Sequence, residues 1–134
     1  MTSKVTYLSA LRTQAEHLKS GDIIITDAPV DNKGKGEAFS PTDLLATSLA
    51  SCMLTIIGIN AQEKGYDIDG TIAEVTKIMD SNPRRVGEIQ INLFFQRSYS
   101  EKEKKLIENS ARTCPVSKSL HPDLKQTIIF NYGH

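Results

Sequence analysis

The segment SPTDLLATSLASCMLTIIGINAQEKG occupies residues 40–65 and predicts a long helix. Ser40 suits an N-cap, Pro41 suits the first helical position, and Asp43 completes a capping box of the S-x-x-D type. Gly65 is a natural stop at the C-terminal end. We therefore expect a helix that begins at Pro41 and ends just before Gly65.

The apolar residues of this 41–64 helix point in many directions around its axis, which is typical of a helix buried on most sides. Ala46 and Ala50 are four residues apart and would allow another backbone to approach closely. The stretch 44–62 carries no formal charge and is long enough to span a membrane. Its polar side chains favour a buried core helix instead. We therefore expect this helix at the centre of the fold.

Short segments that alternate in polarity or are rich in β-branched residues flank the helix. Before it, segments 4–10, 12–18 and 22–26 predict an antiparallel meander, followed by a loop over 27–39. After it we expect strands near 70–79 and 86–97, a helix over 101–112 capped by Ser100 and Glu103, a short helix after Cys114, and a strand over 126–132. This order of elements predicts an α+β fold in a single domain over residues 1–134.

The composition indicates a soluble globular protein and excludes some partners. Lysine plus arginine total 16, aspartate plus glutamate total 16, and the formal net charge is zero. A protein whose main partner is nucleic acid needs a basic face, so we expect no nucleic acid partner. The N-terminus has no apolar signal region. We therefore expect a cytoplasmic protein with no membrane partner, in a compartment where thiols stay reduced.

Cys52 and Cys114 are the two cysteines, too few for a disulfide scaffold. The three histidines are scattered and no CxxC motif is present, so we expect no metal site and no bound cofactor. Free cysteines are often ordinary core residues. However, Cys52 stands among small and polar residues, and Cys114 precedes Pro115 at an expected helix start, where backbone N–H groups favour a thiolate. A thiolate and a second cysteine together can form a redox-active pair.

Charged residues near such a pair are harder to assign. Asp43 fits a helix cap, and it can also anchor an arginine over the Cys52 thiol. Arg12, Arg84 and Arg85 are the candidates to stabilise a thiolate and orient a peroxide. Their spacing in the sequence does not choose among them.

The segment TDAPVDNKGKGEAFSPTDLLATSLASCM, followed further along by CPVSKSL, resembles the OsmC/Ohr family. These are the osmotically inducible protein C and organic hydroperoxide resistance proteins, and the order of elements matches over essentially the whole chain. The resemblance implies an intertwined homodimer in which curved antiparallel sheets pack around long buried central helices. It also implies active sites at the subunit interface.

The resemblance further implies a cysteine-based peroxidase, an oxidoreductase that reduces organic hydroperoxides. Cys52 matches the peroxidatic cysteine, which becomes a sulfenic acid, and Cys114 matches the resolving one, which closes a disulfide. A dithiol reductant, such as a lipoyl group, would then restore both thiols. The apolar Leu49, Met53 and Ile56 around Cys52 would favour fatty or aromatic hydroperoxides over hydrogen peroxide.

The sequence departs from the family pattern at the charged positions. Better-studied peroxidases have a glutamate where Thr42 stands, and here the acidic residue is Asp43, one position later. Arg12 is the nearest match to the family arginine, while Arg84 and Arg85 remain alternatives. Two other functions of the same fold also remain open: a non-catalytic ligand-binding protein, and a redox sensor that passes its disulfide to a partner protein.

Overall fold

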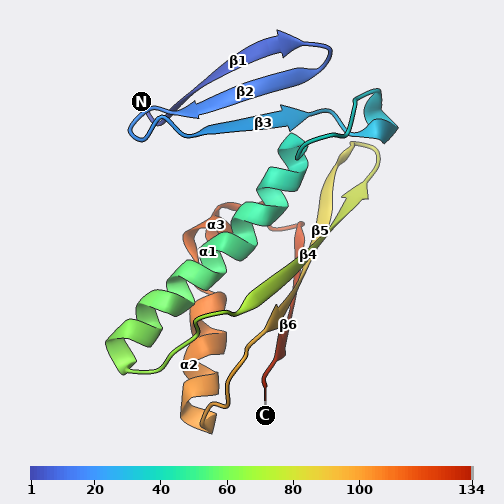
Figure 1. Ribbon diagram of the computed structural model, residues 1–134. Helices are drawn as coiled ribbons and strands as arrows, with labels where there is room; N and C mark the ends of the chain where they lie inside the picture. The colour runs from blue at the N-terminus through green and yellow to red at the C-terminus, as the bar shows by residue number, and fades with distance from the viewer. Residues whose placement is uncertain (134) are drawn as a thin grey trace. The chain divides into compact units, whose positions relative to one another are not determined.

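The computed structural model describes residues 1–133, which form two three-stranded sheets, one long helix and shorter helices (Figure 1). The elements are β1 (Ser3–Ser9), β2 (Arg12–His17), β3 (Ile23–Asp27), the 3-10 helix η1 (Val30–Asn32), α1 (Pro41–Lys64), β4 (Ile72–Asp80), β5 (Arg85–Phe94), α2 (Glu101–Ala111), α3 (Pro115–Ser119) and β6 (Lys125–Asn131). The expected α+β fold is confirmed. Contacts divide the chain into two compact units, with the boundary inside α1 between Leu45 and Ala46. The single domain over residues 1–134 stays a prediction.

The first unit contains the antiparallel sheet β1-β2-β3, as the meander prediction required. The register places Arg12 directly opposite Asp27. The loop after β3 folds back on itself, because Gly34 N–H donates to the Pro29 carbonyl at 2.9 Å. A Cβ at Gly34 would lie 1.7 Å from the Ala28 carbonyl oxygen, so no larger residue fits there.

The second sheet, β4-β5-β6, is mixed, and the expectation of antiparallel sheets alone is wrong for it. β4 and β5 form an antiparallel hairpin, but β6 runs parallel to β5. Parallel neighbours need a long crossover connection, usually helical. Here α2 and α3 supply that connection between β5 and β6.

Helix α1 has the predicted ends. The side chain of Ser40 accepts a hydrogen bond from Asp43 N–H at 3.0 Å, and the Asp43 carboxylate accepts one from Ser40 N–H at 3.0 Å. This is the reciprocal capping box. At the other end Gly65 has φ +81°, and its N–H donates to the Ala61 carbonyl at 2.9 Å. The left-handed glycine therefore ends the helix, as the sequence indicated.

The sides of α1 differ from the expectation, because only one stripe of the helix is buried in a single chain. Its buried residues recur every three or four positions, as one helical face does. Leu45 and Ile59 lie elsewhere on the helix and are exposed. By length and composition alone α1 would also suit a membrane span, a property shared by core helices of soluble proteins. The buried residues are Ala46, Leu49, Ala50, Met53, Ile57 and Ala61.

The core of the second unit forms where this stripe meets the sheet and α2. Leu49, Met53 and Ile57 belong to one cluster with Ile91 of β5 and Ile107 of α2. Burying each such side chain stabilises the fold by roughly 1.5–3 kcal/mol. This packing fixes the rotation of α1 and thus the direction of its other side chains, including that of Cys52.

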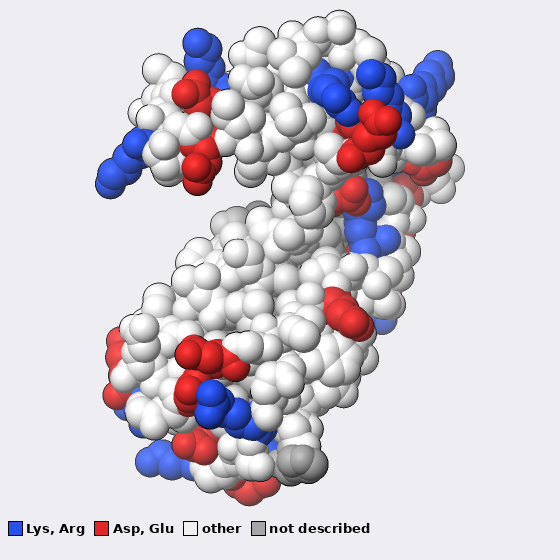
Figure 2. Space-filling view, viewed as in Figure 1, with Lys and Arg blue, Asp and Glu red and all other residues white. Residues whose placement is uncertain are grey.

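Charges of both signs are mixed on the surface. Figure 2 shows lysine and arginine side chains beside aspartate and glutamate side chains, with no extended area of one sign on the visible face. This pattern agrees with the zero net charge and offers no basic stripe there for a phosphate backbone.

Candidate functional site

Cys52 lies on α1 immediately before the fully buried Met53. Its side chain is half-buried and packs against the hydrophobic core of the second unit. One helical step rotates a side chain by about 100°. The packed stripe of α1 therefore directs Cys52 to the margin of the core, where the residue remains partly accessible.

Cys114 lies at the N-cap of α3, directly before Pro115, as the sequence predicted. Its side chain is 0% exposed in the single chain. The backbone N–H of Ser117 donates to the Cys114 sulfur at 3.4 Å. Cys114 is thus a buried thiol held by the first turn of a short helix.

The structure brings the two sulfurs together. Both cysteines are free, and the side chain of Cys52 is within hydrogen-bonding reach of the Cys114 thiol. Burial raises the pKa of Cys114, the neighbouring Cys52 raises it further, and the N–H groups of Ser117 and Val116 lower it by less. The expectation of a thiolate favoured at Cys114 is therefore wrong, because burial outweighs the helix start. The pKa of the Cys114 thiol therefore lies above its ordinary value.

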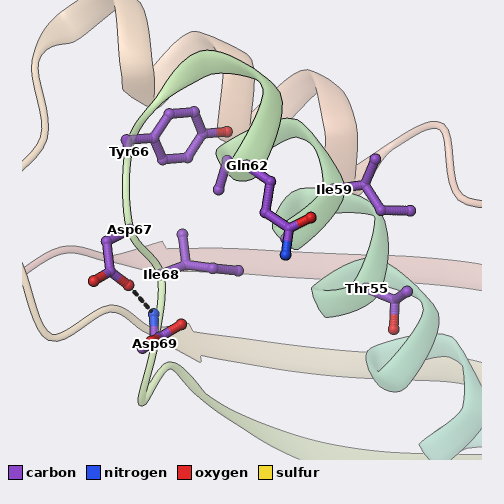
Figure 3. Close-up of a pocket in the computed structure, with 9 residues that line it drawn as sticks. Thr55, Ile59, Gln62, Tyr66, Asp67, Ile68 and Asp69 are labelled. Carbon is purple, nitrogen blue, oxygen red and sulfur yellow. Dashed lines mark hydrogen bonds between the residues drawn. The ribbon is translucent and has the colours of Figure 1, made fainter.

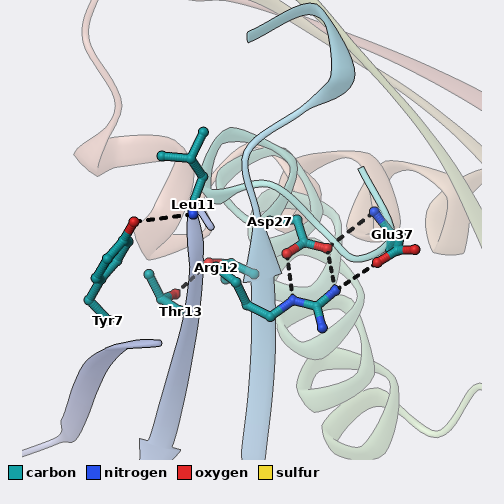
Figure 4. A network of polar contacts seen from close by, with 7 residues as sticks. Tyr7, Leu11, Arg12, Thr13, Asp27 and Glu37 are labelled. Atoms are coloured by element: carbon teal, nitrogen blue, oxygen red, sulfur yellow. Dashed lines mark hydrogen bonds and ion pairs between the residues drawn. The ribbon is translucent and has the colours of Figure 1, made fainter. Parts of the chain in front are cut away.

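Arg12 lies in the first unit and is held by two carboxylates (Figure 4). Its Nε donates to Asp27 Oδ1 at 2.7 Å, and one terminal nitrogen donates to Asp27 Oδ2 at 2.9 Å. The same nitrogen also reaches Glu37 Oε1 at 3.1 Å. Asp27 is 1% exposed, and the hydrogen bonds from Arg12 keep its pKa below the ordinary value despite burial. Arg12 is consequently fixed as a permanent cation in one orientation.

The sequence analysis missed both partners of Arg12. A signal for Asp27 was present, because the turn at Ser20-Gly21 fixes the pairing of the two strands around it. His17 and Asp22 close that turn through a backbone hydrogen bond of 2.8 Å, and counting outward from them reaches Arg12 opposite Asp27. Glu37 gave no such signal, since it reaches Arg12 through an irregular loop.

Two of the other charged candidates, Asp43 and Arg85, have local structural partners. The Asp43 carboxylate caps α1 through Ser40 N–H, which fits the capping interpretation, and any role beside the thiol stays a prediction. Arg85 lies 3.9 Å from Asp80 at the end of the β4–β5 hairpin, where both side chains are about half exposed. Such exposed pairs contribute little to stability. Arg84 lies in the turn of the same hairpin.

A hollow of about 540 Å³ lies along the C-terminal half of α1 (Figure 3). Thr55, Ile59 and Gln62 line it from the helix, and Tyr66 and Asp67 line it from the segment that follows. Neither cysteine is among its lining residues. Two of the polar groups of this hollow are engaged within the chain, since Tyr66 donates to Asn60 and Asp67 pairs with Arg97 at 3.0 Å. They do not specify a ligand.

Within residues 1–133, no group of three or more histidine, cysteine, aspartate or glutamate side chains is placed to hold a metal ion. The chemistry that these residues offer is that of a thiol pair, and elsewhere that of a fixed arginine. The long helix α1 carries the half-accessible thiol of Cys52, which lies beside the buried thiol of Cys114. The chain is therefore an α+β protein with two neighbouring cysteines.

Comparison with known proteins gives the family. Residues 34–128 match the family described as OsmC-like protein. The chain therefore belongs to the OsmC-like protein family, as its sequence motifs suggested. No match was found among curated proteins.

Solved structures agree with this assignment. A candidate osmotic stress induced and detoxification response protein from Psychrobacter arcticus is 62% identical, with a TM-score of 0.95 over 98% of this chain and 96% of that one. The OsmC-like protein of Mycoplasma pneumoniae is 22% identical, with a TM-score of 0.82 over 98% of this chain and 96% of that one. The organic hydroperoxide resistance protein OhrB of Bacillus subtilis is 18% identical, with a TM-score of 0.68 over 98% of each chain. The latter two share the fold.

Proposed function

We propose that this protein is a thiol-dependent peroxidase that reduces organic hydroperoxides through Cys52 and Cys114. The observation that carries the proposal is the pairing of a half-accessible thiol with a fully buried thiol in direct reach of it. A solvent-borne oxidant can meet only the accessible sulfur. The buried sulfur is suited to act after that, on its neighbour.

The proposed reaction has two steps. The Cys52 thiolate attacks the hydroperoxide, the O–O bond breaks, and the alcohol leaves with a proton while Cys52 becomes a sulfenic acid. Cys114 then attacks the oxidised sulfur, so that a disulfide forms and water leaves. An external dithiol, for which we propose a lipoyl group or a similar carrier, returns both cysteines to thiols by exchange. This cycle requires a reducing compartment, and we propose the cytoplasm.

Arg12 is the proposed cationic residue of this site. Asp27 and Glu37 hold the guanidinium of Arg12 in one orientation. Arg12 would therefore not have to reorganise during the reaction with the peroxide. Asp43 would contribute by fixing the first turn of the helix that carries Cys52. Arg85 is a weaker candidate, because its observed partner is a hairpin carboxylate, and Arg84 stays an alternative.

The choice of an organic hydroperoxide rests on apolar surroundings and on the name of a relative. OhrB of Bacillus subtilis is named for organic hydroperoxide resistance. Leu49 and Met53 are fully buried in the core and are not free to line a substrate path, contrary to the sequence interpretation. The half-buried Leu54 and Ile56 are the apolar side chains left to meet a substrate tail.

The test is oxidation of the reduced protein with one equivalent of cumene hydroperoxide, followed by intact mass. We expect the loss of two hydrogens in the wild type and no change in Cys52→Ser. Cys114→Ser should stop at a sulfenic acid, which dimedone traps. Hydrogen peroxide is the matched oxidant and should react more slowly.

Turnover separates the peroxidase from the other functions of this fold. With dihydrolipoamide as the reductant, hydroperoxide consumption should continue beyond one equivalent. Thioredoxin serves as the alternative dithiol. Oxidation that stops after one equivalent with every dithiol would favour a redox sensor. A wild type whose thiols do not react with hydroperoxide would contradict the proposal and favour a binding protein.

A further inference from the structure

A side chain of β6 makes two hydrogen bonds to α3, the short helix whose N-cap is Cys114. The Ser117 hydroxyl donates to Gln126 Oε1 at 2.6 Å, and Gln126 Nε2 donates to the Ser117 carbonyl at 3.2 Å. Both polar groups of the Gln126 amide are therefore bound to one residue of α3. Because one group accepts and the other donates, this pair of bonds also fixes the orientation of the amide.

Ser117, which Gln126 holds, also binds the Cys114 sulfur. Its backbone N–H donates to the Cys114 Sγ at 3.4 Å, so one residue binds the sheet on one side and the thiol on the other. Helix α3 has five residues, and a helix of that length is not stable alone in water. Contacts from outside the helix must therefore hold the turn around Cys114, and the Gln126 amide provides two of them.

We infer that Gln126 is a positioning residue, which acts through Ser117 to hold the Cys114 sulfur in place for attack on the oxidised Cys52. The inference rests on the proposed function for the identity of the oxidant. In the step concerned, the Cys114 sulfur bonds to the Cys52 sulfur, the S–O bond of the sulfenic acid breaks, and the thiol proton leaves in the water released.

The physical reason is that intramolecular attack depends on geometry. A misplacement of about 1 Å can slow a positioned reaction by as much as about a hundredfold. The N–H bond from Ser117 also favours the thiolate form of Cys114 against burial and against the facing Cys52 thiol. A looser turn would weaken both effects, while the first reaction, of Cys52 with the peroxide, would not involve Cys114.

The experiment measures the two steps separately in a single turnover with cumene hydroperoxide, by rapid quenching and intact mass. In Gln126→Leu we expect the sulfenic acid to form at the wild-type rate and the disulfide to form about tenfold more slowly. The pH midpoint of the second step should move upward. Ser117→Ala keeps the N–H bond to sulfur and one bond to Gln126, so its effect should be smaller.

Thr127→Val is the matched control. Thr127 is the neighbour of Gln126 on β6, and its hydroxyl donates to Glu88 at 2.6 Å, away from α3. The variant loses a comparable hydrogen bond from the same strand, and both of its steps should match the wild type. If Gln126→Leu does not fold, Ser117→Ala decides: slower disulfide formation with an unchanged first step supports the inference, and a wild-type rate for both steps overturns it.

Two results would overturn the inference: disulfide formation in Gln126→Leu within about twofold of the wild type, or equal slowing of both steps, which would indicate a general loss of structure. A parallel series with the azo oxidant diamide separates this inference from the proposed function. Diamide forms an adduct with one thiol, and the second thiol displaces it as the hydrazine to leave the disulfide. If hydroperoxide fails with the wild type, the peroxidase proposal falls, and the diamide series still decides the role of Gln126.

Discussion

At the scale of single residues, the Asp27 carboxylate is a tightly held charge. It is almost fully buried in the first unit, yet the bidentate hydrogen bonds from Arg12 hold its pKa below the ordinary value. Glu37, which is 66% exposed, binds the same guanidinium from the loop side. Because Asp27 is buried and Glu37 is exposed, the two carboxylates should respond differently to substitution.

Replacing Asp27 by asparagine should lower the melting temperature at neutral pH, because an amide cannot accept two charged hydrogen bonds from Arg12. A carboxylate with a lowered pKa contributes stability that is fully present above its unfolded value, about pH 4, and is lost as the pH falls through the folded value. In Asp27→Asn, the melting temperature should therefore fall less steeply with decreasing pH than it does in the wild type.

Thermal unfolding between about pH 3 and pH 7 checks this prediction. Glu37→Gln is the control, and it should change the curve much less because that carboxylate is exposed. Equal curves for wild type and Asp27→Asn would show that the pair does not contribute to stability.

The resemblance pointed to Arg12, because it gives a residue type at a position, and the role of Arg12 in the site stays a prediction. Its ion-pair partner Asp27 was not identified from the sequence, because Asp27 looks like the start of a loop, and the role of Asp43 beside the thiol stays a prediction. The pairing of β2 with β3 places Asp27 opposite Arg12, and the register of that pairing depends on how the turn between the two strands closes. Gln126 was missed for the same kind of reason, because nothing in the chain order indicates that it meets Ser117.

At the scale of elements, α1 shows what local chemistry can and cannot determine. Its ends follow from Ser40, Asp43 and Gly65, which satisfy backbone groups within a few residues. Its buried sides do not follow, because apolar residues surround the helix while the second unit covers one stripe only. Which stripe is covered depends on where the sheet lies.

Truncation within the buried stripe should be costly. We expect Ile57→Ala to lower the free energy of unfolding by about 2–5 kcal/mol, because Ile57 is 0% exposed and its removal leaves a cavity against the sheet. Glu63→Ala, on the exposed surface near the end of the same helix, should change it by less than about 0.5 kcal/mol. Urea unfolding at one protein concentration measures both, and equal effects would contradict the assigned orientation of α1.

The sequence did not determine the direction of strand β6. The segment around Ile128 alternates and is β-branched, which predicts a strand but not its neighbour. Helices α2 and α3 lie between β5 and β6, and such a crossover permits the parallel pairing that is observed. That pairing is what brings Gln126 of β6 to the helix that follows Cys114.

At the scale of the whole molecule, the first unit lacks a hydrophobic core of its own. Within residues 1–45, all of which the structure describes, the buried residues are the polar Thr26, Asp27 and Ser40. The same sheet exposes Val5, Tyr7 and Ile24, at 63%, 64% and 48%. A three-stranded sheet needs an apolar face buried against another layer to be stable. One chain leaves that requirement unmet.

We propose that a second copy of the chain covers these side chains, in the homodimer that the family resemblance implies. Stable interfaces of this kind bury roughly 1,200–2,000 Å². The wild type should then sediment at twice the 14.8 kDa of one chain, and its melting temperature should rise with protein concentration.

Ile24→Asp tests the surface directly, because Ile24 lies across from Ala15, which in turn pairs with Val5 on the same face of the sheet. A buried charge there should shift the equilibrium toward monomer and lower the melting temperature, since an unpaired carboxylate is costly to desolvate. Lys19→Glu, in the exposed turn between β2 and β3, should leave the dimer intact. A wild-type monomer whose melting temperature is independent of concentration would contradict the dimer. The apolar face of the first unit would then need a different partner.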